Sequence, residues 1–412
     1  MALLTRARRG ESAWFVVNDG AMVTSAMLVA ELTRARYPDL NIPYHSRWRH
    51  FEAGGLDRKP VLDALLAGRT DVANAGHATN ATNAADAARV RFDLTVVSVL
   101  LDAGAGAAWR YTEAGTGQVL SRSEGLGVAS WHGFLDGVFS STAADPLRAD
   151  AAALSRVDAS VLRAVFQSSP SNPMVGLEGR AGLLARLGAA LQVEATKSGL
   201  QARPALMFDR LTGVGRPGGT LTSVSATEVL GEVLRTLGPI WTSGRNVQGL
   251  MAGDVWPHRW AGATVGDGSE DPTTGGWVPF HKLSQWLTYS LLEPLQWAGV
   301  TVTGLDALTG LPEYRNGGLL LDGGVIVPRH PADLLKTFKP QDDFIVEWRA
   351  LTVALLDEVA ALVRQQLDKT AAELPLACIL EGGTWAAGRE IALEQRSGGP
   401  PPLKIDSDGT IF

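Results

Sequence analysis

The chain has 412 residues, of which 45% are apolar and 19% are charged, and this ordinary globular composition argues against a disordered chain. Its formal net charge of -6 gives no overall electrostatic attraction for DNA or RNA. Cys378 is the single cysteine, which excludes an intrachain disulfide and every cysteine-rich zinc pattern and indicates a reducing compartment.

The sequence predicts neither a secretion signal nor a membrane segment. The first residues, MALLTRARRGESAWF, contain arginines but no continuous apolar stretch after them. The longest apolar runs, such as TVVSVLL at residues 95–101, are well short of the roughly 20 residues that cross a bilayer. We therefore expect a soluble, cytoplasmic protein.

Helices and short strands alternate in the first third of the chain. Apolar residues at helical spacing predict a helix over 21–36. Strand-like alternation follows in 42–58, where His45, Arg47 and Arg49 would share one face. The next expected elements are two short alanine-rich helices in 60–90, a strand at 94–101, and a hairpin within 109–124.

Helices dominate the rest of the predicted fold. Leucines repeat every three or four positions in 173–192, as is typical of an amphipathic helix. The stretch 252–279 is rich in Gly, Asp, Thr, Pro and Trp and predicts a long loop, which in a compact domain is often functional. Further helices are expected at 128–141, at 157–169 with Asp158 near its start, at 281–299 and at 343–368.

The prediction is thus a mainly α protein with a small β-hairpin or strand element. We expect a single glycosidase-like unit over residues 1–412. This unit could divide into an α+β part at 1–150 and a helical part at 151–397, with a C-terminal tail at 398–412.

Several common catalytic motifs are missing. The seven histidines are scattered without an HxH or HExxH pair, so a pair such as His45 and His50 is a weak metal candidate, and we expect neither a metal nor a cofactor. The GxSxG motif of serine hydrolases is absent. The glycine runs at 102–108 and 213–219 lack the P-loop and dinucleotide patterns, and we interpret them as turns.

Carboxylates and cationic side chains remain, and residues 282–322 concentrate them. Cleavage of an N-glycosidic bond needs a carboxylate facing an oxocarbenium-like centre, a group that protonates or binds the departing nitrogen, and donors that hold the sugar. The alternative is structural: Glu313 and Asp306 would cap helix ends, and Arg315 would pair with one of them.

Five stretches carry a family resemblance: PYHSRWRHFEAGG, NPMVGLEGRAGLL, WVPFHKLSQWLTYSLLEP, LTGLPEYRNGGLLLDGG and the final SDGTIF. They resemble a family of conserved proteins, formerly of unknown function, that is tied to a uracil-catabolism pathway in which uracil becomes a ribosylurea compound. This resemblance covers nearly the whole chain.

Six further motifs occur in one order: WRYTE with VASWHGF, LEGRAGLLARLG, FHKLSQ, LDALTGLPEYR, EWRALT and ILEGGTW. In this order they are similar to motifs of the queuosine-salvage nucleotide glycosidases. Glu313 stands where that family has Asp, so its carboxylate reaches one methylene further. Beyond Arg315, that family's Val-Pro-Gln is replaced by Asn-Gly-Gly.

Those glycosidases are similar in fold to helix-hairpin-helix DNA glycosylases, and LTGLPEY loosely matches the hairpin. The resemblance therefore implies a helix-hairpin-helix DNA-glycosylase-like helical core with a glycosidase cleft. In that fold a carboxylate beyond the hairpin often reacts, which makes Asp322 and Asp333 rivals of Glu313. The acidic net charge argues against a DNA substrate.

The resulting hypothesis is an N-glycosidase that hydrolyses ribosylurea, or its 5′-phosphate, to urea and a ribose product. Glu313 or Asp322 would orient the attacking water. Candidate donors to the departing urea are Lys282, Arg315 and Tyr314. The expected substrate-binding residues are Gln285 for the ureido amide, Arg47 and Arg49 for a phosphate, Trp385 for stacking, and also His281 and Glu381.

Two other functions remain open. An amidohydrolase would attack the ureido carbon and release ammonia, which normally needs a metal or an activated nucleophile. A non-catalytic pathway protein would bind a nucleotide intermediate without turnover. In each case the expected partner is a small nucleoside-like or nucleotide-like molecule, not a nucleic acid or a membrane, and the sequence does not fix the oligomeric state.

Overall fold

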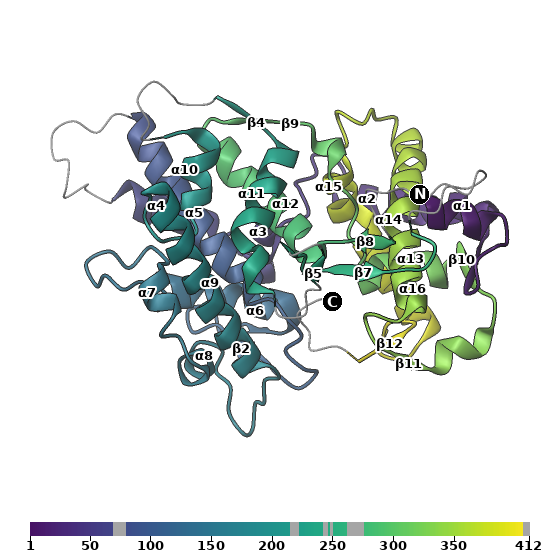
Figure 1. The fold of residues 1–412 in the computed structure, drawn as a ribbon, viewed down its shortest axis with the longest axis horizontal. Helices are drawn as coiled ribbons and strands as arrows, with labels where there is room; N and C mark the ends of the chain where they lie inside the picture. The colour runs from purple at the N-terminus through teal and green to yellow at the C-terminus, as the bar shows by residue number, and fades with distance from the viewer. Residues whose placement is uncertain (69–79, 215–221, 242–245, 248–249, 262–275, 407–412) are drawn as a thin grey trace. The chain divides into compact units, whose positions relative to one another are not determined.

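The computed structural model describes residues 1–68, 80–214, 222–241, 246–247, 250–261 and 276–406 (Figure 1). Its described part confirms the mainly α prediction, because strands occur there only in two-stranded pairs. The chain divides into two compact units, and neither has a boundary at residue 150. The first unit comprises residues 1–45, 243–285 and 305–412, and the second comprises 46–242 and 286–304.

The first unit is built around the long helix α14, Asp343–Leu367, which packs against α1, α2 and α13 (Figure 1). The helices predicted at 21–36 and 343–368 are confirmed here. The other helices of this unit are α1 (Ala2–Arg8), α2 (Met22–Arg36), α13 (Tyr314–Asp322), α15 (Leu376–Ile379) and α16 (Trp385–Gln395). Shorter turns are η1 (Asp19–Ala21), η4 (Leu305–Ala307), η5 (Pro331–Leu335) and the π-helix η6 (Leu380–Thr384).

Short strand pairs tie distant segments of the first unit together. The antiparallel pairs are β1 (Phe15–Val17) with β10 (Ile326–Pro328), β5 (Asn246–Val247) with β6 (Leu250–Met251), and β7 (Val255–Pro257) with β8 (Trp277–Pro279). A parallel pair joins β11 (Thr337–Phe338) to β12 (Lys404–Ile405). The predicted loop at 252–279 thus begins and ends in paired strands, and its residues 262–275 lie outside the described residues.

The helices α13 and α16 approach each other closely enough to touch through their backbones. A Cβ atom on Gly388 would lie 2.0 Å from the backbone oxygen of Arg315. A Cβ atom on Gly317 would likewise lie 2.4 Å from the ring of Trp348 in α14. Glycine is therefore required at both positions, and these contacts fix the start of α13.

The second unit is also helical, and α5 (Asn80–Leu100) packs against α6, α9 and α10. The predicted helices at 157–169 and 173–192 and the predicted hairpin are confirmed. Its other helices are α3 (Arg47–His50), α4 (Lys59–Ala67), α6 (Arg122–Leu135), α7 (Ala151–Leu154), α8 (Ala159–Val165), α9 (Leu177–Ser198), α10 (Leu206–Thr212), α11 (Ala226–Leu237), η2 (Ala53–Gly55) and η3 (Gly238–Ile240). Its strand pairs are β2 (Tyr111–Thr112) with β3 (Val119–Leu120), and β4 (Ser223–Ser225) with β9 (Thr301–Thr303).

Two strand predictions in the second unit are wrong. The apolar run 94–101 belongs mostly to the helix α5. Its side chains are buried on every face of this helix, so burial rather than β propensity decides its structure. Residues 47–50 form the short helix α3, because the side chain of Ser46 caps its first turn by accepting from the backbone N–H of Trp48. The helix α12, Lys282–Trp297, confirms the prediction at 281–299 and crosses the unit boundary after Gln285.

Candidate active site

The carboxylate of Glu313 caps the N-terminus of α13. Its two oxygens accept from the backbone N–H groups of Arg315, at 2.8 Å, and of Asn316, at 2.6 Å. An anion at a helix N-terminus is also favoured by the helix dipole. The residue is only 7% exposed, so the carboxylate is held in a fixed position inside the first unit.

The electrostatic environment of Glu313 makes it a better base than an ordinary glutamate. Burial raises the pKa of its carboxyl group above the usual value. The two backbone donors and the positive charges of Lys282 and His45 act in the opposite direction, but they do not cancel the effect of burial. A carboxyl group whose pKa is shifted toward neutrality is suited to general base catalysis.

Lys282 is positioned by the partly buried carboxylate of Asp254 at the start of α12. Its backbone N–H donates to Asp254 at 3.0 Å, and Arg349 forms a two-pronged ion pair with the same carboxylate at 2.8 and 2.7 Å. Burial alone would raise the pKa of Asp254, but Arg349 and the neighbouring donors hold it below its usual value. Asp254 is therefore an anion that anchors the start of α12.

Arg349 also connects this anchor to Glu313. Its Nε donates at 3.4 Å to the backbone oxygen of Pro312, the residue before Glu313, and its guanidinium lies 4.0 Å from the ring centre of Phe280. One side chain of α14 therefore contacts both the segment that holds Lys282 and the segment that holds Glu313. The predicted sequence motifs contain Arg349 but do not indicate its partner Asp254.

Gln285 and His281 flank Lys282. Gln285 lies three residues after Lys282, on the same helical face, and its buried side-chain oxygen has no hydrogen-bond partner among the described residues. His281 adopts a φ of 46°, which is rare for a residue other than glycine and is often found at functional sites. Burial lowers the pKa of its imidazole, and the charge of Asp254 opposes that effect.

Arg315, Tyr314 and Trp385 form a second part of the same site. The guanidinium of Arg315 lies 5.0 Å from the ring centre of Tyr314 and 5.9 Å from that of Trp385. Its Nη1 donates to the backbone oxygen of Gly399 at 3.0 Å, whereas its buried Nε has no hydrogen-bond partner among the described residues. Arg315 thus pairs with a carbonyl group, and the exposed Asp306 lies near Arg364 instead.

Glu381 extends from the π-helix η6 and binds His45. Nδ1 of His45 lies 2.9 Å from the carboxylate, which also accepts from Arg36 at 3.0 Å and from the Tyr37 hydroxyl at 3.2 Å. His45 thus contacts Glu381 directly, and its positive charge acts to lower the pKa of Glu313. No motif signalled this role, because Glu381 lies 336 residues after His45 in the chain.

Asp322 lies at the other end of α13. It lies nine positions after Glu313, which corresponds to about 13 Å along a helix. Its carboxylate forms a two-pronged ion pair with Arg396, at 2.9 and 2.5 Å. The second rival, Asp333, is buried and pairs with Lys336 at 2.6 Å. The structure therefore brings Lys282 and His45 to Glu313 and gives the two other carboxylates cationic partners of their own.

The two arginines predicted to bind phosphate belong to α3 in the second unit. Arg47 is fully buried, pairs with Asp102 and donates to Ser98 at 2.7 Å. Arg49 pairs with Glu293 at 2.8 Å and with Glu52 at 2.7 Å. Each guanidinium thus contacts carboxylates of its own unit, and phosphate binding by these residues stays a prediction.

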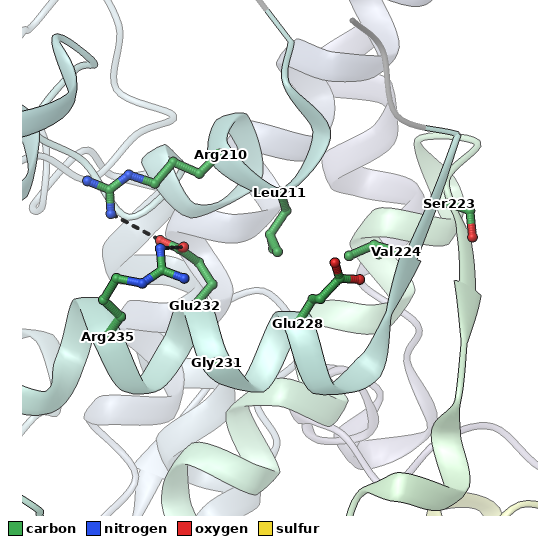
Figure 2. Close-up of a pocket in the computed structure, with 8 residues that line it drawn as sticks. All are labelled: Arg210, Leu211, Ser223, Val224, Glu228, Gly231, Glu232 and Arg235. Carbon is green, nitrogen blue, oxygen red and sulfur yellow. Dashed lines mark hydrogen bonds and ion pairs between the residues drawn. The ribbon is translucent and has the colours of Figure 1, made fainter.

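A pocket of about 480 Å³ opens in the second unit, between α10, β4 and α11. Figure 2 shows Arg210 and Arg235 both turned toward Glu232, and the pairs formed by these three side chains carry most of its charge. None of the predicted site residues lines this pocket.

The described residues contain no group of three or more His, Cys, Asp or Glu side chains that could hold a metal ion. No described helix is long and apolar enough to cross a membrane.

Comparison with known sequences identifies relatives that match most of the chain. A family model described as "Protein of unknown function (DUF1688)" matches residues 1–412. Uracil catabolism protein 4 of Lachancea kluyveri is 36% identical over 392 residues, which cover 90% of this chain and 85% of that protein. Protein urg3 of Schizosaccharomyces pombe is 38% identical over 374 residues, which cover 90% of this chain and 84% of that protein.

Proposed function

The chain belongs to the DUF1688 family, and from this premise we propose that it is an N-glycosidase that hydrolyses ribosylurea, free or as its 5′-phosphate, in uracil catabolism. The products are urea and ribose or ribose 5-phosphate. The name of the relative from Lachancea kluyveri supports the pathway. The reaction type is supported by one observation above all: Glu313 is a buried carboxylate whose pKa is raised and which lies in the field of two cationic side chains.

In the proposed reaction Glu313 is the general base. Its carboxylate orients a water molecule against the anomeric carbon and takes a proton as the new C–O bond forms and the C–N bond breaks. The negative charge of the carboxylate also stabilises the oxocarbenium-like transition state. The two backbone N–H groups at the start of α13 keep the carboxylate in place, so it does not reorganise during the reaction.

The remaining side chains bind the substrate. The buried oxygen of Gln285 accepts a hydrogen bond from an N–H group of the ureido moiety, which would satisfy an acceptor that is otherwise buried without a partner. Lys282 supplies positive charge opposite the leaving group. Trp385, Tyr314 and Arg315 provide flat surfaces and a donor for the sugar or the planar urea.

The test is to incubate the purified, metal-stripped protein with ribosylurea or its 5′-phosphate and to measure urea, ammonia and reducing sugar separately. We expect urea and sugar in equal amounts, strongly reduced turnover by Glu313→Gln, and full turnover by Asp306→Asn, a matched change of an exposed carboxylate in the same segment. Ammonia without urea would instead identify an amidohydrolase. Substrate binding without any product would identify a non-catalytic binding protein.

A further inference from the structure

The carboxylate of Glu381 is surrounded by donors. It is only 8% exposed and binds the guanidinium of Arg36 at 3.0 Å, the hydroxyl of Tyr37 at 3.2 Å and Nδ1 of His45 at 2.9 Å. A guanidinium partner favours the ionised form of a carboxyl group. Because an ionised carboxylate can only accept hydrogen bonds, Nδ1 of His45 must be the donor.

The backbone of the π-helix η6 places Glu381 where these donors can reach it. Arg36 also donates to the backbone oxygens of Glu381 and Gly382, which the local π geometry leaves accessible. A Cβ atom on Gly383 would lie 2.4 Å from the backbone oxygen of Val29, so glycine is required for η6 to approach α2 this closely. The position of Glu381 over the end of α2 is therefore built into the backbone.

The same contacts determine which nitrogen of His45 can exchange a proton. With Nδ1–H donated to Glu381, Nε2 is the nitrogen that gains or loses a proton. The backbone N–H of His45 donates to the oxygen of Ala377 at 2.9 Å, which fixes the residue against α15. The side chain of His45 remains 16% exposed, so its ring is not sealed from a small molecule.

We propose that His45 is the acid that protonates the leaving group in the N-glycosidase reaction, and that Glu381 is the residue that positions it. The proposal rests on the proposed function and gives a catalytic role to His45, which the sequence indicated only as a weak metal candidate. Glu381 holds the ring through Nδ1 and stabilises its positive charge. His45 and Glu313 belong to the same unit of the chain.

The proton transfers balance as follows. The C–N bond of the ribosylurea breaks, and the departing urea nitrogen takes the proton from Nε2 of His45. Water forms the new C–O bond and gives one proton to Glu313. The extra proton on Glu313 then returns to His45 through solvent, so the net reaction consumes one water and releases urea and the sugar.

His45 is better suited to this step than the other cationic side chains. A guanidinium such as that of Arg315 does not release its proton in proteins, and an ammonium such as that of Lys282 normally releases it only well above neutral pH. An imidazole exchanges protons near neutral pH. Lys282 therefore contributes charge, and His45 contributes the proton.

The experiment combines kinetics with nitrogen NMR of ¹⁵N-histidine-labelled protein. We expect His45→Gln to lower kcat about 10²- to 10⁴-fold, the usual contribution of a general acid, while the exposed control His330→Gln changes kcat less than about 2-fold. Added imidazole should partly restore turnover in His45→Ala. In the wild-type spectrum, Nδ1 of His45 should carry a proton, and Glu381→Gln should change the tautomer and lower kcat more than it changes KM.

The outcomes separate this proposal from the proposed function. If the wild-type protein releases urea but His45→Gln retains full kcat, the acid role is overturned and the N-glycosidase stands. If the neutral imidazole of His45 is protonated only at Nε2, the positioning role of Glu381 is overturned, and this measurement needs no substrate. If the wild-type protein releases neither urea nor sugar, both proposals fail.

Discussion

Two buried glutamates, one in each unit, show how the partners of a carboxylate decide its chemistry. Glu113, in the hairpin turn after β2, is 3% exposed and binds Arg58 through both oxygens, together with His132 and Thr116. These hydrogen bonds lower the pKa of Glu113 to about 2, and the bond from Arg58 has the largest effect. Glu313 is similarly buried but accepts from two neutral backbone groups, and burial raises its pKa.

The comparison teaches that burial alone does not make a carboxylate reactive. The adjacent guanidinium of Arg58 favours the ionised form of Glu113. Among the described residues, Glu313 accepts hydrogen bonds from backbone N–H groups and from no guanidinium, and burial makes its ionised form costly to hold in the first unit. A buried carboxyl group with a raised pKa results at the start of α13, and a structural ion pair with Arg58 results at the hairpin.

The largest expected difference between the two residues is catalytic. We predict that Glu313→Gln lowers kcat about 10²- to 10⁴-fold, because the amide cannot take a proton from water. The amide oxygen can still accept one backbone hydrogen bond, so the free energy of unfolding should fall by only about 1 kcal/mol. Steady-state kinetics and guanidinium chloride unfolding measure the two effects. If the variant has a normal kcat, Glu313 is a structural helix cap and not the general base.

For Glu113 we predict the opposite result: a large loss of stability and little change in kcat. The difference between its ordinary pKa of 4.5 and its pKa of about 2 corresponds to about 3 kcal/mol of stability at neutral pH. Glu113→Gln should therefore lower the free energy of unfolding by about that amount and leave kcat within about 2-fold. Guanidinium chloride unfolding at pH 7, beside an activity assay, makes the comparison. Loss of activity in a fully folded variant would contradict it.

The pH dependence of stability should have opposite signs for the two glutamates. The stability that Glu113 contributes is complete above pH 4.5 and is lost as the pH falls from 4.5 toward 2, because the unfolded chain binds the proton first. For Glu313 the folded state binds the proton first, so stability decreases as the pH rises above 4.5. Unfolding curves of the wild type and each Gln variant between pH 2.5 and 8 measure both slopes. If both glutamates change the free energy of unfolding with pH in the same direction, the predicted difference between them is wrong.

The smallest effect is expected from Asp322→Asn. Removing the charge weakens a partly buried ion pair with Arg396, which we expect to lower the free energy of unfolding by about 1 to 2 kcal/mol. Because Asp322 lies at the far end of α13 from Glu313, kcat should stay within about 3-fold of the wild type. Steady-state kinetics on the folded variant test this prediction. A loss of kcat as large as that of Glu313→Gln would identify Asp322 as the general base.

The long helices were predictable because their sequences repeat at helical spacing, as in α9 and α14. The run at 94–101 was mispredicted because a β-branched segment buried on all sides has no amphipathic period that could distinguish a helix from a strand. The short helix α3 was missed because four residues offer too few positions to separate the two patterns.

The candidate site was predictable only in part. The sequence motifs and the family resemblance placed Glu313, Lys282 and Gln285 in one region, and the structure also groups Lys282 with Glu313 electrostatically. The pairing of Asp254 with Arg349 and of His45 with Glu381 escaped prediction, because these contacts join residues that lie 95 and 336 positions apart. Local patterns carry no information about such pairs.

The double contact of Arg349 has a consequence for the order of folding. Its guanidinium touches Asp254 and the Pro312 carbonyl, so three segments that are far apart in the chain must meet before Lys282 and Glu313 are held in place. Contacts between distant segments form late, because each requires a long loop to close. The protein should therefore gain the geometry of the candidate site only at the end of folding, after residue 349 has been synthesised and α14 has docked.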